Sequence, residues 1–175
     1  MSHLVTLRTE LQAQDLLLLM KWMANEHVYR YLNEQQQIAA QLKQVYDARL
    51  PALTPLLNRN GRFLMICTAS GQAIGFLRIA HGPDETAELV IAIGEESMWG
   101  RRYGSVGLSE ALKIAFFEMR KQEVVAHIAN ENSRSQRLFV SRGFAPCARG
   151  AHSTQYRLTM DAYLHPKACE RDEIA

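Results

Sequence analysis

Residues 88–144 read ELVIAIGEESMWGRRYGSVGLSEALKIAFFEMRKQEVVAHIANENSRSQRLFVSRGF, and this stretch decides the fold. It opens with a run rich in Val and Ile, Glu88 to Ile93, which is typical of a buried strand. A Gly-rich segment, Gly100 to Gly104, comes next. A helix is predicted from there to about Lys121, with apolar residues at helical spacing: Leu108, Leu112, Ala115, Phe116 and Met119.

Downstream of that helix the chain alternates between the two kinds of element. Val124 to Ile128 predicts a strand, and Ser133 to Ser141 predicts a short helix that ends at Gly143. Gln155 to Met160 predicts a final strand, and the residues near Phe144 have room for one more. The second half of the chain is therefore helix, strand, helix and strand.

The first half of the chain predicts a short strand and two helices. Leu4 to Arg8 alternates weakly, as a strand does, and Gln14 to His27 carries apolar residues on one helical face. A second helix is expected over Asn33 to Arg49, with Asn33 as a candidate N-cap. Pro51 and Pro55 break the helical pattern that precedes them.

A hairpin links this half to the deciding stretch. Arg62 to Thr68 and Ala73 to Ala80 predict two strands around a turn at 70–71, and a second turn at 82–84 leads into the strand at Glu88. Three antiparallel strands in a meander are the simplest interpretation. The whole pattern predicts an α+β fold, with a single domain over residues 1–165 and a polar tail over 166–175.

The composition excludes several classes of protein. The 175 residues hold 20 Lys and Arg against 18 Asp and Glu, a net charge of +2, which does not favour a nucleic-acid-binding surface. The cysteines lack metal-ligand spacing, so no metal site is expected and all three are interpreted as reduced thiols: Cys67, Cys147 and Cys169. The first residues lack the layout of a signal peptide, and no run reaches the ~20 apolar residues of a membrane span. We expect a cytoplasmic protein without a membrane partner.

The loop after the Val/Ile-rich strand has features of a phosphate-binding site. The first N–H groups of a helix have no partner within the helix and carry partial positive charge, so phosphate groups bind there. Arg101 and Arg102 add two guanidinium groups. Taken alone, a Gly-rich segment between a strand and a helix is more often an ordinary turn. It is neither a Walker loop nor a dinucleotide fingerprint, because no G-K-S/T follows it and G-x-G-x-x-G is absent.

With its flanks, this loop resembles the acetyl-CoA loop of the GCN5-related N-acetyltransferase (GNAT) superfamily, which reads Q/R-x-x-G-x-G/A. Gly104 matches that pattern, whereas Trp99 stands at its first position and Arg102 at its first Gly. The residues Trp99-Gly100 and Tyr103-Gly104 are similar to the branch of ribosomal-protein N-acetyltransferases.

Residues 132–144, NSRSQRLFVSRGF, are similar to the family's second signature, N-x-x-A/S-x-x-L/F-Y-x-x-x-G-F. In the family this Asn opens a helix beside the pantetheine arm of the cofactor, and Gly-Phe ends that helix. The two signatures follow each other in the family's order with a strand between them. Together they are far more specific than either is alone.

The resemblance implies a central mixed, mostly antiparallel sheet that splays between its fourth and fifth strands and is flanked by about four helices. It implies acetyl-CoA as co-substrate in that split, and it gives no reason to expect a metal. The residues that it assigns to cofactor binding are Ala92, Ile93, Gly94, Gly100, Arg101, Arg102, Tyr103, Gly104, Ser105, Asn132 and Phe139.

The chemistry of amine acetylation draws attention to Glu88 and to Phe139. Glu88 matches the strand position where several members carry a general base, although a solvated Glu at the start of a strand is the other interpretation. Phe139 stands where many members have a Tyr that protonates the departing thiolate, and Phe has no proton to give. His127 is interpreted as a structural strand residue, and Arg142 as a solvated residue that could otherwise meet the 3′-phosphate of CoA.

Three functions remain open at this point. The leading hypothesis is transfer of acetyl from acetyl-CoA to a primary amine, with a small-molecule acceptor, by direct attack in a ternary complex. A protein N-terminus as acceptor is the second, and a non-catalytic acyl-CoA-binding regulatory module is the third. A homodimer is possible under each of them.

Overall fold

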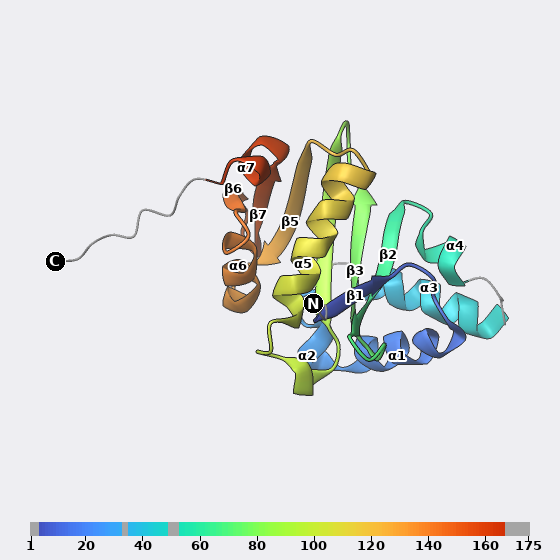
Figure 1. Ribbon diagram of the computed structural model, residues 1–175. Coiled ribbons are helices and arrows are strands. Elements are labelled where there is room, and N and C mark those ends of the chain that lie inside the picture. The colour runs from blue at the N-terminus through green and yellow to red at the C-terminus, as the bar shows by residue number, and fades with distance from the viewer. Residues whose placement is uncertain (1–3, 33–34, 49–52, 167–175) are drawn as a thin grey trace.

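The computed structural model describes residues 4–32, 35–48 and 53–166, which form one seven-stranded sheet covered by helices on both faces (Figure 1). The strand order is β1-β2-β3-β4-β5-β7-β6. The strands are β1 Val5–Arg8, β2 Gly61–Thr68, β3 Ala73–His81, β4 Thr86–Ile93, β5 Glu123–Ala129, β6 Ala145–Arg149 and β7 Ser153–Thr159. All neighbours are antiparallel except β4 and β5, so the expected mixed, mostly antiparallel sheet is confirmed.

The described residues form seven α-helices. They are α1 Ala13–Ala24, α2 Glu26–Tyr29, α3 Gln35–Ala48, α4 Leu53–Leu57, α5 Tyr103–Lys113, α6 Ser133–Val140 and α7 Met160–Leu164. A 3₁₀ turn, Glu96–Met98, precedes α5, and a π-helical turn, Ile114–Glu118, continues it. The four longest helices are the ones expected from the sequence, and the three short ones, α2, α4 and α7, were not expected.

Two apolar clusters lie on opposite faces of the sheet. Along β2 the side chains alternate, so that Leu64 and Ile66 pack with α5 on one face while Phe63 and Met65 pack with α1, α3 and α4 on the other. In Figure 1 helix α5 crosses the near face, α1, α3 and α4 gather at the β1–β2 end, and α2 lies nearer the middle of the sheet. A sheet buried on both sides in this way explains why its central strands read as nearly continuous apolar runs.

The sheet opens between β4 and β5. These parallel strands pair over only three positions: Thr86 with Glu123, Ala87 with Val124, and Glu88 with Val125. Beyond Glu88, β4 continues to Ile93 and pairs with no described strand other than β3. The splay that the resemblance implied is therefore confirmed, and it places Glu88 at the point where the two strands separate.

Local side-chain chemistry moves several helix boundaries. The helix expected over 14–27 is broken at Asn25, whose side chain accepts the His27 N–H and starts α2. Pro55 lies within the first turn of α4, where its missing N–H costs no helical bond. The last predicted strand ends one residue early, because Thr159 caps α7. The Asn33 cap, Pro51 and the tail from residue 167 lie outside the described residues.

The C-terminal part agrees with its predicted pattern. The extra strand near Phe144 is β6, at the edge of the sheet. Gly143 follows α6 with φ +90°, the left-handed conformation that favours glycine after a helix. Within the described ranges, no helix is long and apolar enough to cross a membrane.

Candidate active site

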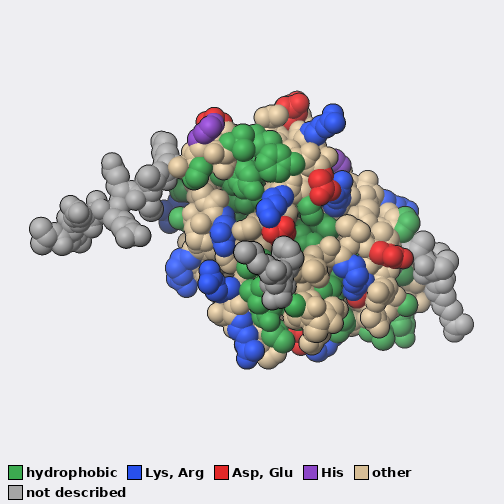
Figure 2. Space-filling view, in the orientation of Figure 1, with side chains coloured by type: hydrophobic (Ala, Val, Ile, Leu, Met, Phe, Trp, Pro, Cys, Tyr) green, Lys and Arg blue, Asp and Glu red, His purple; other side chains and the backbone are tan. Residues whose placement is uncertain are grey.

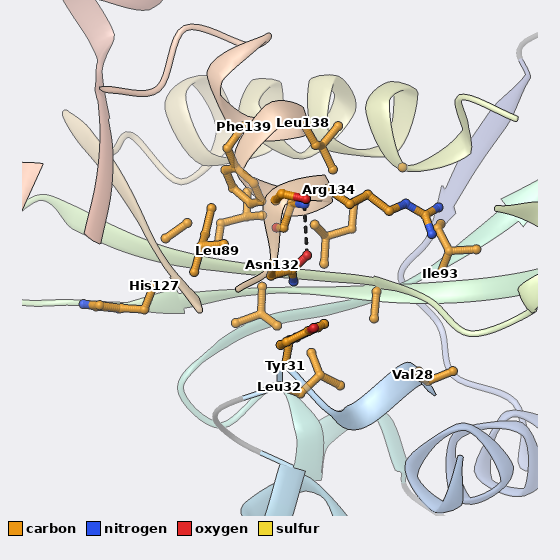
Figure 3. Close-up of a pocket in the computed structure, with 18 of the residues that line it drawn as sticks. Val28, Tyr31, Leu32, Leu89, Ile93, His127, Asn132, Arg134, Leu138 and Phe139 are labelled. Atoms are coloured by element: carbon orange, nitrogen blue, oxygen red, sulfur yellow. Dashed lines mark hydrogen bonds between the residues drawn. The ribbon is translucent and has the colours of Figure 1, made fainter. Parts of the chain in front are cut away.

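A cavity of about 360 Å³ occupies the opening between β4 and β5. One wall is the exposed edge and face of β4, and the opposite wall is β5 with the start of α6. Helix α2 and the residues after it close one side. Figure 3 shows Tyr31 and Leu32 on one side of the strands, and Leu138, Phe139 and Arg134 on the other. The cavity therefore passes through the sheet and is reached from both of its faces.

The backbone of β4 presents hydrogen-bonding groups to this cavity. The Gly94 N–H donates to the Ile74 carbonyl on β3 at 2.9 Å. Because backbone groups alternate in direction along a strand, those of Ile91 and Ile93 face away from β3, into the opening. The indole N–H of Trp99 donates to the Ile93 carbonyl at 2.8 Å, which agrees with that direction.

The loop between β4 and α5 keeps a tight turn without the expected glycine. Arg102 is the N-cap residue of α5 and has φ +67° and ψ 2°, the left-handed region in which Gly is usually found. Gly100 is also left-handed, at φ +76°. The substitution of Arg for Gly at 102 therefore leaves the turn intact, at a cost of about 1–2 kcal/mol for a residue with a side chain.

The N-terminus of α5 is open to an anion. No side chain caps this helix, and its first internal bond runs from the Val106 N–H to the Arg102 carbonyl. The N–H groups of the residues in between have no partner within the helix. A Cβ placed on Gly104 would have its nearest neighbour, Leu138 Cδ2, at 3.7 Å, so the start of the helix has free space around it.

Four arginines surround this helix end. Arg101 and Arg102 are exposed in the loop, and the Arg134 guanidinium lies 4.8 Å above the Trp99 ring. Arg142 reaches from the end of α6 and donates to the Ser105 hydroxyl, while its buried Nε has no hydrogen-bond partner in the described part of the chain. None of the four forms an ion pair with a carboxylate of a described residue. Figure 2 shows Lys and Arg gathered over α6 and the start of α5.

Helix α6 supplies the polar and the apolar part of the opposite wall. The Asn132 side chain accepts the Ser135 N–H at 3.1 Å and so caps the helix at the edge of the cavity (Figure 3). Phe139 is 2% exposed and packs edge-to-face on Phe144, with ring centroids 4.9 Å apart. Phe139 thus forms an apolar surface in the cavity and carries no acidic proton.

A carboxylate and an imidazole meet where the strands separate. Glu88 Oε1 on β4 lies 2.9 Å from Nδ1 of His127 on β5, and both residues line the cavity. Their side chains are 33% and 38% exposed. The sequence analysis treated His127 as a structural residue, because only the register of the parallel pair β4–β5 places it beside Glu88.

The cavity contains about half of the residues predicted for it. Those that line it are Glu88, Ala92, Ile93, Gly104, Asn132 and Phe139. Gly100, Arg101, Arg102, Tyr103 and Ser105 lie in the adjoining loop and helix start. Gly94 has a packing role, because a Cβ there would overlap the Trp22 indole. Sequence reasoning missed two groups: the α2 side, with His27, Val28, Tyr31 and Leu32, and the Trp99–Arg134 contact.

Helices α1 and α2 are joined to the residues after β4 by polar contacts. Glu95 accepts hydrogen bonds from the Trp22 indole at 2.9 Å and from Lys21 at 3.0 Å. These two donors, the indole first, hold the pKa of the Glu95 carboxyl below its ordinary value. Asn25, the cap of α2, donates to Glu96 at 2.7 Å. Among the described residues, no group of three or more His, Cys, Asp and Glu side chains could hold a metal ion.

The sequence matches the family model of the acetyltransferase (GNAT) domain over residues 5–145. The chain belongs to the GNAT acetyltransferase family. It is an acyltransferase that uses acetyl-CoA, and the GNAT fold explains the opening between β4 and β5. Among curated proteins, none matches the sequence significantly.

Solved structures share this GNAT fold at low sequence identity. Spermidine N-acetyltransferase from Vibrio cholerae, in complex with CoA and spermine, superposes with a TM-score of 0.75 at 19% identity over 92% of this chain and 98% of that one. A domain from Methanocaldococcus jannaschii gives 0.71 at 23% identity, over 89% and 98%. The N-acetyltransferase PseH from Campylobacter jejuni gives 0.64 at 16% identity, over 90% and 99%.

The site of this GNAT protein fits acetyl-CoA. The uncapped helix end and the four arginines, none of which forms an ion pair with a described carboxylate, provide the donors and positive charge that phosphate groups need. The apolar wall of Leu138 and Phe139 and the free backbone edge of β4 suit a long, partly amide-bearing arm.

Proposed function

We propose that this protein acetylates the primary amine of a small molecule, by direct attack of the amine on acetyl-CoA in a ternary complex. The observation that carries this proposal is the cavity that passes through the sheet, with the anion-binding loop on one side and α2 on the other. Such a cavity lets two substrates approach one reaction centre from opposite faces. Its volume of about 360 Å³ is in the range of small-ligand sites.

The two ends of the cavity have different roles in this proposal: one binds the phosphates and the other holds the reacting groups. The phosphates of acetyl-CoA would bind at the start of α5, with the loop residues 100–105 around them, and Asn132 would lie beside the pantetheine arm. The pantetheine arm would then run back along β4 toward Glu88. The six residue steps from Gly94 to Glu88 span about 20 Å at about 3.3 Å per residue. We assign the polarisation of the thioester carbonyl to the backbone N–H of Ile91, which faces the opening and lies nearer to Glu88 than that of Ile93 does.

The reacting end carries a base and lacks the usual acid. We assign to Glu88 and its surroundings the removal of the ammonium proton, because Glu88 lies where the strands separate and lines the cavity. Phe139 packs against the arm and donates no proton, so the thiolate takes its proton from the reacting amine or from water.

Two alternatives make different demands on the same site. A protein N-terminus as acceptor rests on the similarity of Trp99-Gly100 and Tyr103-Gly104 to the ribosomal-protein branch. The spermidine acetyltransferase likeness supports a small amine instead. A non-catalytic acyl-CoA-binding module rests on Phe139 and on the departure of the loop from the family's pattern. The cytoplasmic location is supported by two free thiols, Cys67 and the exposed Cys147. A homodimer stays a prediction.

A binding assay and a thiol-release assay test the function together. Acetyl-CoA is titrated by calorimetry, and CoA release is followed with benzylamine, spermidine and an unblocked peptide. We expect micromolar binding of acetyl-CoA and release of thiol with a small amine. Release with the peptide alone would favour the protein acceptor, and binding without any release would favour the module. Loss of binding in Arg134→Ala but not in Arg137→Ala, an exposed residue of the same helix outside the cavity, would support the assigned phosphate end.

A further inference from the structure

The hydrogen bond between Glu88 and His127 spans the opening of the sheet at its narrow end. Glu88 is the last β4 residue paired with β5, opposite Val125, and His127 lies two residues farther along β5. The 2.9 Å contact therefore joins the strands just past their last backbone pair. Figure 3 places His127 at the end of the cavity opposite Arg134, which is the end away from the phosphate loop.

Both side chains belong to the acceptor face of the sheet. Ala87 and Leu89 on β4, and Ala126 and Ile128 on β5, pack in the cluster beneath α5. Because side chains alternate along a strand, Glu88 and His127 point to the other face, where α2 lies. That face is the one from which an amine would enter under the proposed function.

The direction of this hydrogen bond determines what His127 can do. An ionised carboxylate only accepts hydrogen bonds, so the proton in the contact belongs to Nδ1 of His127. A neutral imidazole protonated on Nδ1 keeps its lone pair on Nε2. The arrangement is the one in which a carboxylate fixes the tautomer and orientation of a basic histidine. Oε1 of Glu88 accepts this hydrogen bond.

We propose that His127, not Glu88, is the group that takes the proton from the acceptor ammonium, and that Glu88 is its positioning residue. This inference rests on the proposed function and specifies its base. His127 Nε2 takes one proton from the ammonium, and the freed amine nitrogen forms a bond to the thioester carbon. The carbon–sulfur bond breaks, and its electron pair stays on sulfur. A second N–H proton of the amine ends on the thiolate to give CoA, and His127 returns its proton to water at the exposed end of the cavity.

Kinetics with the amine that the wild-type protein acetylates fastest, from benzylamine and spermidine, test this assignment. We expect His127→Gln to lower kcat by about 100- to 1,000-fold, the usual contribution of a general base, with the KM for acetyl-CoA unchanged. Glu88→Gln should lower kcat less. Added imidazole should restore part of the activity of His127→Ala. His81→Gln, at an exposed histidine outside the cavity, is the control, and each variant should melt at the wild-type temperature.

Two results would overturn the assignment. One is His127→Gln within threefold of wild type while Glu88→Gln is inactive, which would make Glu88 the base. The other is loss of activity in His27→Gln but not in His127→Gln, because His27 lines the same cavity from α2. A wild-type protein that binds acetyl-CoA and releases thiol with none of the amines would overturn the proposed function itself.

A spectroscopic measurement tests the geometry without any acceptor. The ring nitrogens of His127 can be observed by ¹⁵N NMR and assigned by their loss in His127→Gln. We expect the neutral ring to carry its proton on Nδ1 in the wild type, and this preference to weaken in Glu88→Gln. A proton on Nε2 in the wild-type neutral ring would contradict the proposal, whatever the activity.

Discussion

The two sides of the cavity, which we propose bind the cofactor and the acceptor, are built by different means. The cofactor side comes from consecutive elements, residues 88–144, and presents mainly backbone: the edge of β4 and the uncapped end of α5. The other side comes from α2 and the residues after it, with α1 behind them. It is attached through side chains, with Trp22 against Gly94 and Glu95, and Asn25 on Glu96. The two sides meet at residues 94–96. We infer that residues on the acceptor side can change more easily to suit a different amine, because side chains can be replaced while the backbone geometry of the cofactor side tolerates less change.

The largest expected effect comes from removing the main acceptor-side contact. Trp22 is 1% exposed, packs in the α1–α4 cluster and donates to Glu95, so Trp22→Ala should lower the free energy of unfolding by about 3–5 kcal/mol. Urea unfolding measures this change. Trp22→Phe, which keeps most of the volume, should cost much less. If the two sides are built as described, the KM for the amine should rise more than the KM for acetyl-CoA.

The second test acts at the junction itself. A Cβ on Gly94 would overlap the Trp22 indole, which is buried and cannot move aside, so Gly94→Ala should cost about 3 kcal/mol. Gly104→Ala is the matched control on the cofactor side. A Cβ at this position would lie 3.7 Å from its nearest neighbour, Leu138. Gly104 lies within α5, and in a helix Ala is favoured over Gly by up to about 1 kcal/mol. Equal destabilisation of both variants would contradict the special role of residue 94.

The same division explains what could be predicted from the sequence. The run from Glu88 to Phe144 was predicted well, because strand composition, a glycine-rich turn and helical spacing are local signals. The splay between β4 and β5 followed from the resemblance to the family. The break at Asn25 was missed, since its capping bond to the His27 N–H competes with a continuous helical pattern.

Contacts between distant residues were the hardest to foresee. Glu88 and His127 meet only through the register of two parallel strands 39 positions apart, which no local pattern specifies. The left-handed turn at Arg102 was also hidden, because the sequence at that position argues against it. Trp99 reads as a departure from a motif, yet its indole binds the Ile93 carbonyl and supports Arg134.

A third prediction tests whether the turn on the cofactor side is determined by its backbone conformation more than by the side chain of Arg102. Arg102→Gly should raise the free energy of unfolding by about 1 kcal/mol, because glycine adopts φ +67° without strain. Arg101→Gly is the control, since Arg101 is not left-handed and should gain nothing. Calorimetry should show weaker acetyl-CoA binding in both variants, as each removes one charge from the phosphate end. No gain in stability for Arg102→Gly would mean that the Arg side chain itself holds the turn.

The smallest expected effect on stability comes from the hydrogen bonds that join Trp22 and Lys21 to Glu95, and its size depends on pH. Hydrogen bonds from Trp22 and then Lys21 lower the pKa of Glu95 below its ordinary 4.5 in the folded protein. A group with a lowered pKa stabilises the fold fully above its unfolded pKa and loses that contribution as pH falls through the folded value. Glu95→Gln should therefore cost up to about 1 kcal/mol at pH 7, and the gap to wild type should begin to close below about pH 4.5.

Urea unfolding at a series of pH values between 7 and 3 measures that gap. Lys21→Met is the control variant, and it should change stability less than Glu95→Gln, because the indole is the stronger of the two donors to Glu95. A gap between Glu95→Gln and wild type that stays constant down to pH 3 would show that the carboxylate charge is not what ties α1 to the end of β4. The attachment of the acceptor side would then rest on the packing of Trp22 against Gly94 and on the uncharged hydrogen bonds, without a contribution from the Glu95 charge.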